Sequence, residues 1–126
     1  MRCLLFVLIS FLTACTVPGP PAVTEPPPRL TGGWTLKTAI PATESFPLAL
    51  KPATAWRASY QGPADFVAYF YLFNSNTEAF EAVQKWRKAP GEITFHDGSF
   101  LVVIPAKDIP TQASGDFVEA IMAAIH

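Results

Sequence analysis

Short apolar runs along the chain predict five β-strands. Apolar and polar positions alternate over residues 56–61, a pattern typical of a strand with one buried face. Residues 65–73 (DFVAYFYLF) are apolar at nearly every position, which favours an interior strand covered on both faces. Residues 99–105 have the same character and follow residues 92–96 across an Asp-Gly hairpin signal. Residues 34–40 complete the set.

Two segments place apolar residues at helical spacing and predict α-helices. The first follows Ser75 and Glu78, a capping box, and stops before Pro90. Its apolar stripe contains Phe80, Val83 and Trp86. The second is expected to begin at a cap on Ser114 or Asp116. Its apolar stripe contains Phe117, Val118, Ile121, Met122 and Ile125.

The order of these elements predicts an α+β fold for residues 33–126, taken as one small domain. We expect an antiparallel sheet of four to five strands, with two helices packed mainly on one face. One helix layer would leave the second face of strand 65–73 uncovered. Three aromatic residues lie on that face, and they form the candidate binding surface: Tyr69, Tyr71 and Phe73.

The first residues of the chain form a short apolar segment behind one positive charge. Arg2 precedes the apolar residues 3–12, a length that suits the hydrophobic region of a signal peptide. A membrane span would need about 20 apolar residues. The segment is therefore an ordinary signal peptide, a lipoprotein signal peptide or a buried part of the fold. An ordinary cleavage site after Ala14 fits poorly, because Leu12 occupies a position that prefers a small residue.

The residues that end this segment, Leu12-Thr13-Ala14-Cys15, resemble the bacterial lipobox at all four positions. The resemblance implies a signal peptide over residues 1–14, recognised by its peptidase through Leu12, Thr13 and Ala14. It also implies that Cys15 becomes the mature N-terminus and carries a diacylglyceryl group, usually with N-acylation. Cleavage removes Cys3, and lipidation accounts for the single remaining thiol. The resemblance covers residues 1–15 and does not extend to residues 33–126.

Residues 15–32 are rich in proline and predict an extended tether between the lipid anchor and the domain. Proline lacks a backbone donor and has a fixed φ, so such a segment favours polyproline II over helix or central strand. A second interpretation of the same prolines is a PxxP ligand for an aromatic groove.

Charge and composition exclude several classes of function. The chain has only two histidines, His96 and His126, and the Cys15 thiol is assigned to lipidation, so we expect no metal site, no cofactor and no enzyme activity. A net charge of −1 argues against nucleic-acid binding. The basic residues Lys85, Arg87 and Lys88 are explained by the favourable position of cations at a helix C-terminus.

These observations lead to two hypotheses for a lipoprotein held at the cell membrane and facing the periplasm or the outside. Thr16 follows the cysteine instead of Asp, which the resemblance links to the outer membrane in cells that have two membranes. In the first hypothesis the domain binds another envelope component, a protein partner. In the second it binds a small molecule or lipid in an apolar cleft lined by Trp56, Phe70 and Trp86.

Overall fold

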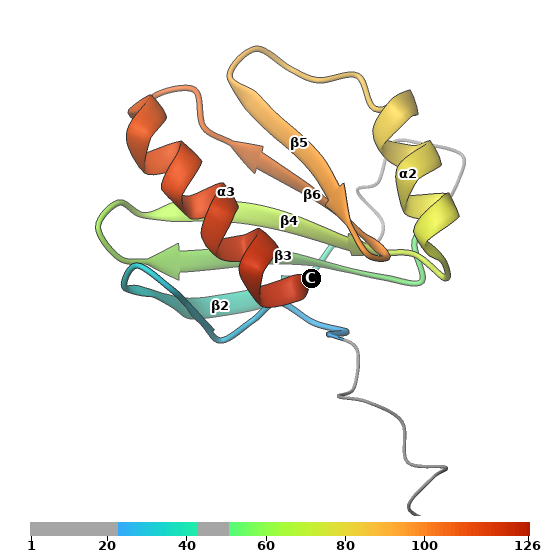
Figure 1. Cartoon of the computed structure of the whole chain (residues 1–126), viewed down its shortest axis with the longest axis horizontal. Coiled ribbons are helices and arrows are strands. Elements are labelled where there is room, and N and C mark those ends of the chain that lie inside the picture. The colour runs from blue at the N-terminus through green and yellow to red at the C-terminus, as the bar shows by residue number, and fades with distance from the viewer. Residues whose placement is uncertain (1–22, 43–50) are drawn as a thin grey trace, which may run out of the picture.

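The computed structural model describes residues 23–42 and 51–126, and these form a curled, six-stranded antiparallel sheet with two helices (Figure 1). The sheet order is β1-β2-β3-β4-β6-β5. The strands are β1 (Arg29–Leu30), β2 (Trp34–Pro41), β3 (Thr54–Gln61), β4 (Phe66–Leu72), β5 (Glu92–Asp97) and β6 (Phe100–Pro105). The helices are α2 (Asn76–Lys85) and α3 (Thr111–Ile125). The α+β class predicted from the sequence is confirmed.

The predicted strand count was wrong because the proline-rich segment contributes a strand. Arg29 pairs with Thr35 and Leu30 with Trp34, so β1 extends the sheet beyond β2. Leu30 is buried, as are Pro26 and Pro27 before it. The end of the predicted tether therefore packs on the folded part instead of standing away from it, because these residues have apolar surface to bury.

The two helices cover opposite faces of the sheet, which corrects the expectation that both lie mainly on one face. Along β4, Phe70 belongs to the apolar cluster of α3, whereas its neighbour Tyr71 belongs to the cluster of α2. Successive side chains of a strand point to opposite faces. The same division holds on β6, where Val102 packs with the α3 cluster and Leu101 with the α2 cluster.

The connection from β4 through α2 to β5 explains why α2 has a face to itself. Both β4 and β5 pair antiparallel with β6, so they run parallel to each other on either side of it. A parallel connection needs a crossover, and here the crossover carries α2 over β5 and β6. The predicted cap of α2 is confirmed, because the Ser75 hydroxyl accepts a hydrogen bond from the Glu78 backbone N–H at 3.2 Å.

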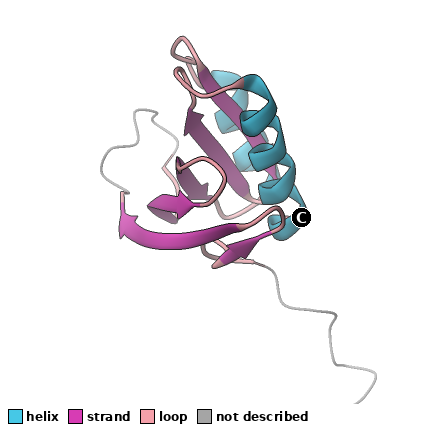
Figure 2. Cartoon of the chain, turned by 90° about the vertical axis from the view of Figure 1, so that its left-hand side faces the viewer, coloured by secondary structure: helices cyan, strands magenta, loops and turns pink. Residues whose placement is uncertain are grey.

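The sheet curls around α3 (Figure 2). The Phe117 side chain of α3 is fully buried in the larger core. The Phe117 ring stacks on Phe66 with centroids 4.1 Å apart. Trp34 and Tyr60 meet the same ring edge-on at 5.2 Å and 5.5 Å. Aromatic pairs in these geometries contribute about 0.5–1.5 kcal/mol each beyond the burial of their area.

Helix α3 begins earlier than its sequence pattern predicts. Its first residue is Thr111 and its N-cap is Pro110, whereas Ser114, one of the predicted caps, is buried within the helix. The Ser114 backbone N–H donates to the Pro110 carbonyl at 3.0 Å. Proline is tolerated here because the first N–H groups of a helix have no partner within it.

Alanine substitution at two glycines is expected to change the free energy of unfolding in opposite directions. Gly115 is exposed on α3, and a Cβ there would meet no atom within 4 Å, so Gly115→Ala should stabilise the fold by about 0.5–1 kcal/mol. Gly91 has φ +77°, and a Cβ there would lie 2.6 Å from the Lys107 Cα. Gly91→Ala should therefore destabilise the fold by more than about 1 kcal/mol. Urea denaturation measures the free energy of unfolding of both variants. Equal changes for Gly115→Ala and Gly91→Ala would contradict the described backbone.

Candidate functional site

The predicted binding surface is largely interior. Tyr71 is 3% exposed and Phe73 is 2% exposed, and both pack with Ala79 and Ala82 of α2. Only Tyr69 stays partly exposed, with its ring stacked 6.3 Å from that of Tyr71. The helix that follows β4 covers this face, so Tyr71 and Phe73 are core residues and do not form an open surface.

The predicted apolar cleft also has a different arrangement. Phe70 and Trp56 pack with the α3 cluster, whereas Trp86 packs with the α2 cluster on the other face. The three side chains therefore do not line one cavity. The Trp86 indole N–H instead donates to the Glu92 carboxylate at 2.7 Å, which ties the end of α2 to the start of β5.

The residues of the lipobox-like motif lie outside the described part of the chain. They are Leu12, Thr13, Ala14 and Cys15. Their roles as the lipidation site and the signal-peptidase recognition site stay predictions.

The structure contains a pocket that the sequence pattern did not predict. Its volume is about 700 Å³, within the range of ligand pockets, and it lies between α3 and the turns that follow β1 and β3. Most of its lining is apolar. The lining residues are Thr31, Gly32, Trp34, Pro63, Pro110, Gln112, Ala113, Asp116, Glu119, Ala120 and Ala123. We call it the Trp34 pocket.

Trp34 lines this pocket although it is only 4% exposed, and its neighbours fix its position. Its indole N–H donates to the Ala64 carbonyl at 2.8 Å. Two turns approach the ring closely. A Cβ on Gly62 would lie 2.5 Å from Trp34 Cδ1, which no side chain fits without movement, and a Cβ on Gly32 would lie 3.0 Å from Trp34 Cζ3. Gly32 also has φ +90°, which side-chain-bearing residues rarely adopt. The indole is thus fixed before any ligand arrives.

The rim of the Trp34 pocket is acidic. Asp116 and Glu119 lie three residues apart on α3, on neighbouring turns of one helix face, and both are exposed. Within residues 23–42 and 51–126, neither carboxylate forms an ion pair with a Lys, Arg or His side chain. Asp116 accepts one hydrogen bond, from the Gln112 amide at 3.0 Å.

A sequence signal for this pocket existed in the glycines around Trp34. Gly32 and Gly33 lie where the predicted tether meets the domain, and Gly62 with Pro63 lies between the predicted strands 56–61 and 65–73. Their spatial convergence on one indole follows from the pairing of β2 with β3, where Thr35 lies opposite Gln61. Helix α3 then supplies the other wall from residues about 50 positions or more further along the chain.

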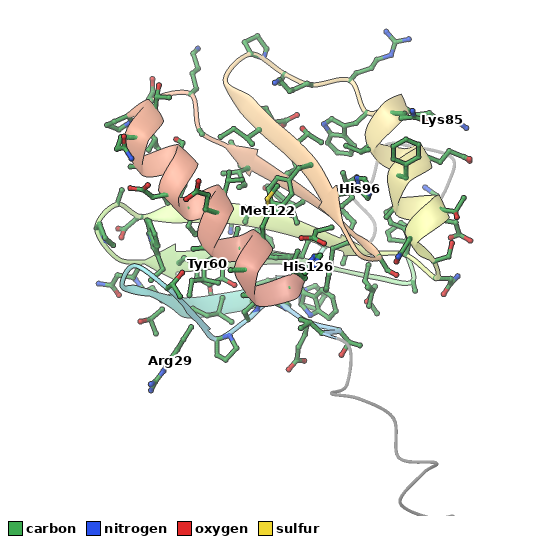
Figure 3. All side chains as sticks on the ribbon, in the orientation of Figure 1. Arg29, Tyr60, Lys85, His96, Met122 and His126 are labelled. Carbon is green, nitrogen blue, oxygen red and sulfur yellow. The ribbon has the colours of Figure 1, made fainter. Side chains whose placement is uncertain are left out.

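The Tyr60 side chain is buried in the larger core. Burial raises the pKa of its hydroxyl above the ordinary tyrosine value, because the charged phenolate would lose its hydration. The hydroxyl donates to the Pro27 carbonyl at 2.7 Å, beneath α3 (Figure 3). This bond holds the proline-rich segment against the sheet.

Among the described residues, no group of three or more His, Cys, Asp and Glu side chains is arranged to hold a metal ion. Neither of the described helices combines the length and hydropathy required for a membrane span. Comparison of the chain with protein-family models, with curated proteins and with solved structures found no match.

Removing the Tyr60 hydroxyl tests its role in stability and its pH dependence. Tyr60→Phe leaves the Pro27 carbonyl without its donor and should cost about 1 kcal/mol at neutral pH. Above about pH 10 the unfolded chain ionises at residue 60 while the folded chain does not, so the wild type should lose up to about 1.4 kcal/mol per pH unit from this residue.

The Tyr60→Phe variant has no hydroxyl to ionise at residue 60. Its free energy of unfolding should therefore fall less steeply than that of the wild type between about pH 10 and pH 11. Chemical denaturation at several pH values measures both slopes. Parallel slopes for the wild type and the variant would rule out a raised Tyr60 pKa.

Proposed function

We propose that this chain is a lipid-anchored binding protein of the bacterial cell envelope, and that its domain binds a small, largely apolar molecule in the Trp34 pocket. The observation that supports the binding role is the pocket itself. It has a volume of about 700 Å³ and is lined by the fixed Trp34 ring. We propose no catalytic role for the domain, because binding requires only the pocket and its lining. The anchor is supported by the lipobox resemblance at Cys15.

The packing of the proline-rich segment supports a short distance between the membrane and the domain. Pro26 and Pro27 are buried against the domain and Pro28 accepts a hydrogen bond from the Leu36 N–H at 2.9 Å. Only residues 15–22 then connect the proposed lipid anchor to the described chain. Eight residues span at most about 28 Å when fully extended. The pocket would accordingly work close to the membrane surface.

A second candidate function is docking onto another envelope component through the open face of β2, β3 and β4. Ile40 is 50% exposed, the largest value among the described large hydrophobic residues. It pairs with Arg57, which pairs in turn with Tyr69, so the three side chains form one row on a single face. Tyr69 is the residue of the predicted surface that stays partly exposed, and Ile40 and Arg57 extend it across the sheet.

Docking at this row would use the face of the sheet and not the edge of β2. The Ala42 N–H donates inward to the Ala55 carbonyl, so the preceding Pro41 nitrogen faces the outer edge, where proline offers no donor. Register shifts between Leu36 and Thr38 also place an irregularity at Lys37. Lysine, proline and bulges at an edge all oppose the addition of another strand.

The anchor is tested by removing the proposed lipidation site. Cys15→Ala should move the protein out of the membrane fraction or leave it as an unprocessed precursor, because stable anchoring requires the acyl chains. Mass spectrometry of the N-terminal peptide of the wild type should show a diacylglyceryl-modified Cys15. A free Cys15 thiol in membrane-extracted protein would contradict the anchor.

The Trp34 pocket is tested by ¹⁹F NMR on the full chain in detergent micelles, with 5-fluorotryptophan at all three tryptophans. A neutral probe, 2-phenylethanol, should shift the Trp34 resonance saturably and leave those of Trp56 and Trp86 unchanged. Trp34→Phe assigns the resonance. Ala123→Leu should weaken binding at least about fivefold, because the larger leucine side chain would occupy part of the pocket. Ala123 is exposed, so the fold should tolerate the change.

The matched control is Gln84→Leu, which adds the same side chain at an exposed position on α2 outside the pocket. It should bind 2-phenylethanol as the wild type does. An equal loss in both variants, or no saturable shift at Trp34, would argue against the proposed function.

A further inference from the structure

We propose that the Trp34 pocket selects a ligand in which an apolar ring or chain carries a protonated amine. This inference rests on the proposed function, and it names the chemical class of the ligand. The pocket combines an apolar floor at Trp34 with a rim in which Asp116 and Glu119 supply the charge. No Lys, Arg or His is among the lining residues.

The position of the two carboxylates on α3 is not explained by the helix dipole or by capping. The favourable effect of acidic groups on the helix dipole falls off within the first turn. The first turn of α3 contains no acidic residue, and Asp116 and Glu119 are the sixth and ninth residues after Pro110. The N-cap position has no side-chain hydrogen bond, so neither residue acts as a cap.

Most of the hydrogen-bonding capacity of the rim is also unused. An ionised carboxylate accepts about four hydrogen bonds. Asp116 receives one from Gln112, and no side chain in residues 23–42 and 51–126 donates to Glu119. These groups accept and do not donate, and an ammonium group is a compact donor of three hydrogen bonds without an acceptor. The rim therefore complements an amine in both charge and hydrogen bonding.

The apolar part of the pocket defines the rest of the ligand. The fixed indole edge, the proline rings and the alanine methyl groups accept hydrocarbon and offer no polar partner to it. A neutral apolar molecule would gain only this contact, and an anion would meet two carboxylates of its own sign. For ligands of one shape, we therefore expect the affinity to decrease from the cation to the neutral molecule and then to the anion.

Three probes of nearly one shape test this ranking: phenethylammonium, 2-phenylethanol and phenylacetate. Each is titrated into the full chain in detergent micelles, with the ¹⁹F resonance of Trp34 as the readout. Phenethylammonium should bind about fivefold more tightly than 2-phenylethanol, since two partly solvated ionic contacts together contribute on this scale. Phenylacetate should bind more weakly than both. Added salt should reduce the preference, because it screens exposed charges.

Two double variants that remove the same charge make the test specific. Asp116→Asn with Glu119→Gln should abolish the preference for phenethylammonium and leave 2-phenylethanol binding unchanged, which also shows that the pocket is still folded. Asp65→Asn with Glu81→Gln removes two carboxylates that do not line the pocket and should keep the preference.

Each other result has a defined meaning. Equal affinities for phenethylammonium and 2-phenylethanol in the wild type would overturn the amine inference and leave the pocket as a site for neutral molecules. A preference that survives Asp116→Asn with Glu119→Gln would overturn it as well. Absence of a saturable Trp34 shift with all three probes would overturn the proposed function together with the inference.

Discussion

The packing of Phe117 against the concave face of the sheet is the interaction on which the rest of the structure depends. Its ring stacks on Phe66 and meets Trp34 and Tyr60 edge-on, so one side chain of α3 contacts residues from β2, β3 and β4. Burying these rings requires the sheet to curl until its β1–β2 edge reaches the helix. The Trp34 pocket lies directly beside this contact, since Trp34 and three alanines of α3 line it.

The same aromatic cluster links the fold to the proposed tether. Tyr60 lies under Phe117 and donates to the Pro27 carbonyl, so the proline-rich segment is held by a residue of the core. A polar group buried this deeply needs its hydrogen bond. The packing of α3, the position of the segment that leads toward Cys15 and the shape of the pocket are therefore parts of one arrangement.

Much of the local structure could be predicted from the sequence, because local patterns carry it. The alternation over residues 56–61, the doubly apolar run of β4 and the Ser75 cap all reflect neighbours that are close along the chain. Strand β1 could not be predicted in this way, because two residues have no periodicity. The sequence of β4 shows that its second face is apolar. The cover of that face by α2 depends on the position of β5 beyond β6, and no local pattern records that position.

The candidate site shows the same limit. Cys15 could be proposed from four consecutive residues, whereas the Trp34 pocket is assembled from two turns and a helix that lie far apart in the sequence. The most direct test of the account is to measure nuclear Overhauser effects from bound phenethylammonium to the protein. Contacts to the Trp34 ring and the Ala123 methyl group are expected. Contacts confined to Ile40 and Tyr69, on the open face of the sheet, would contradict the account.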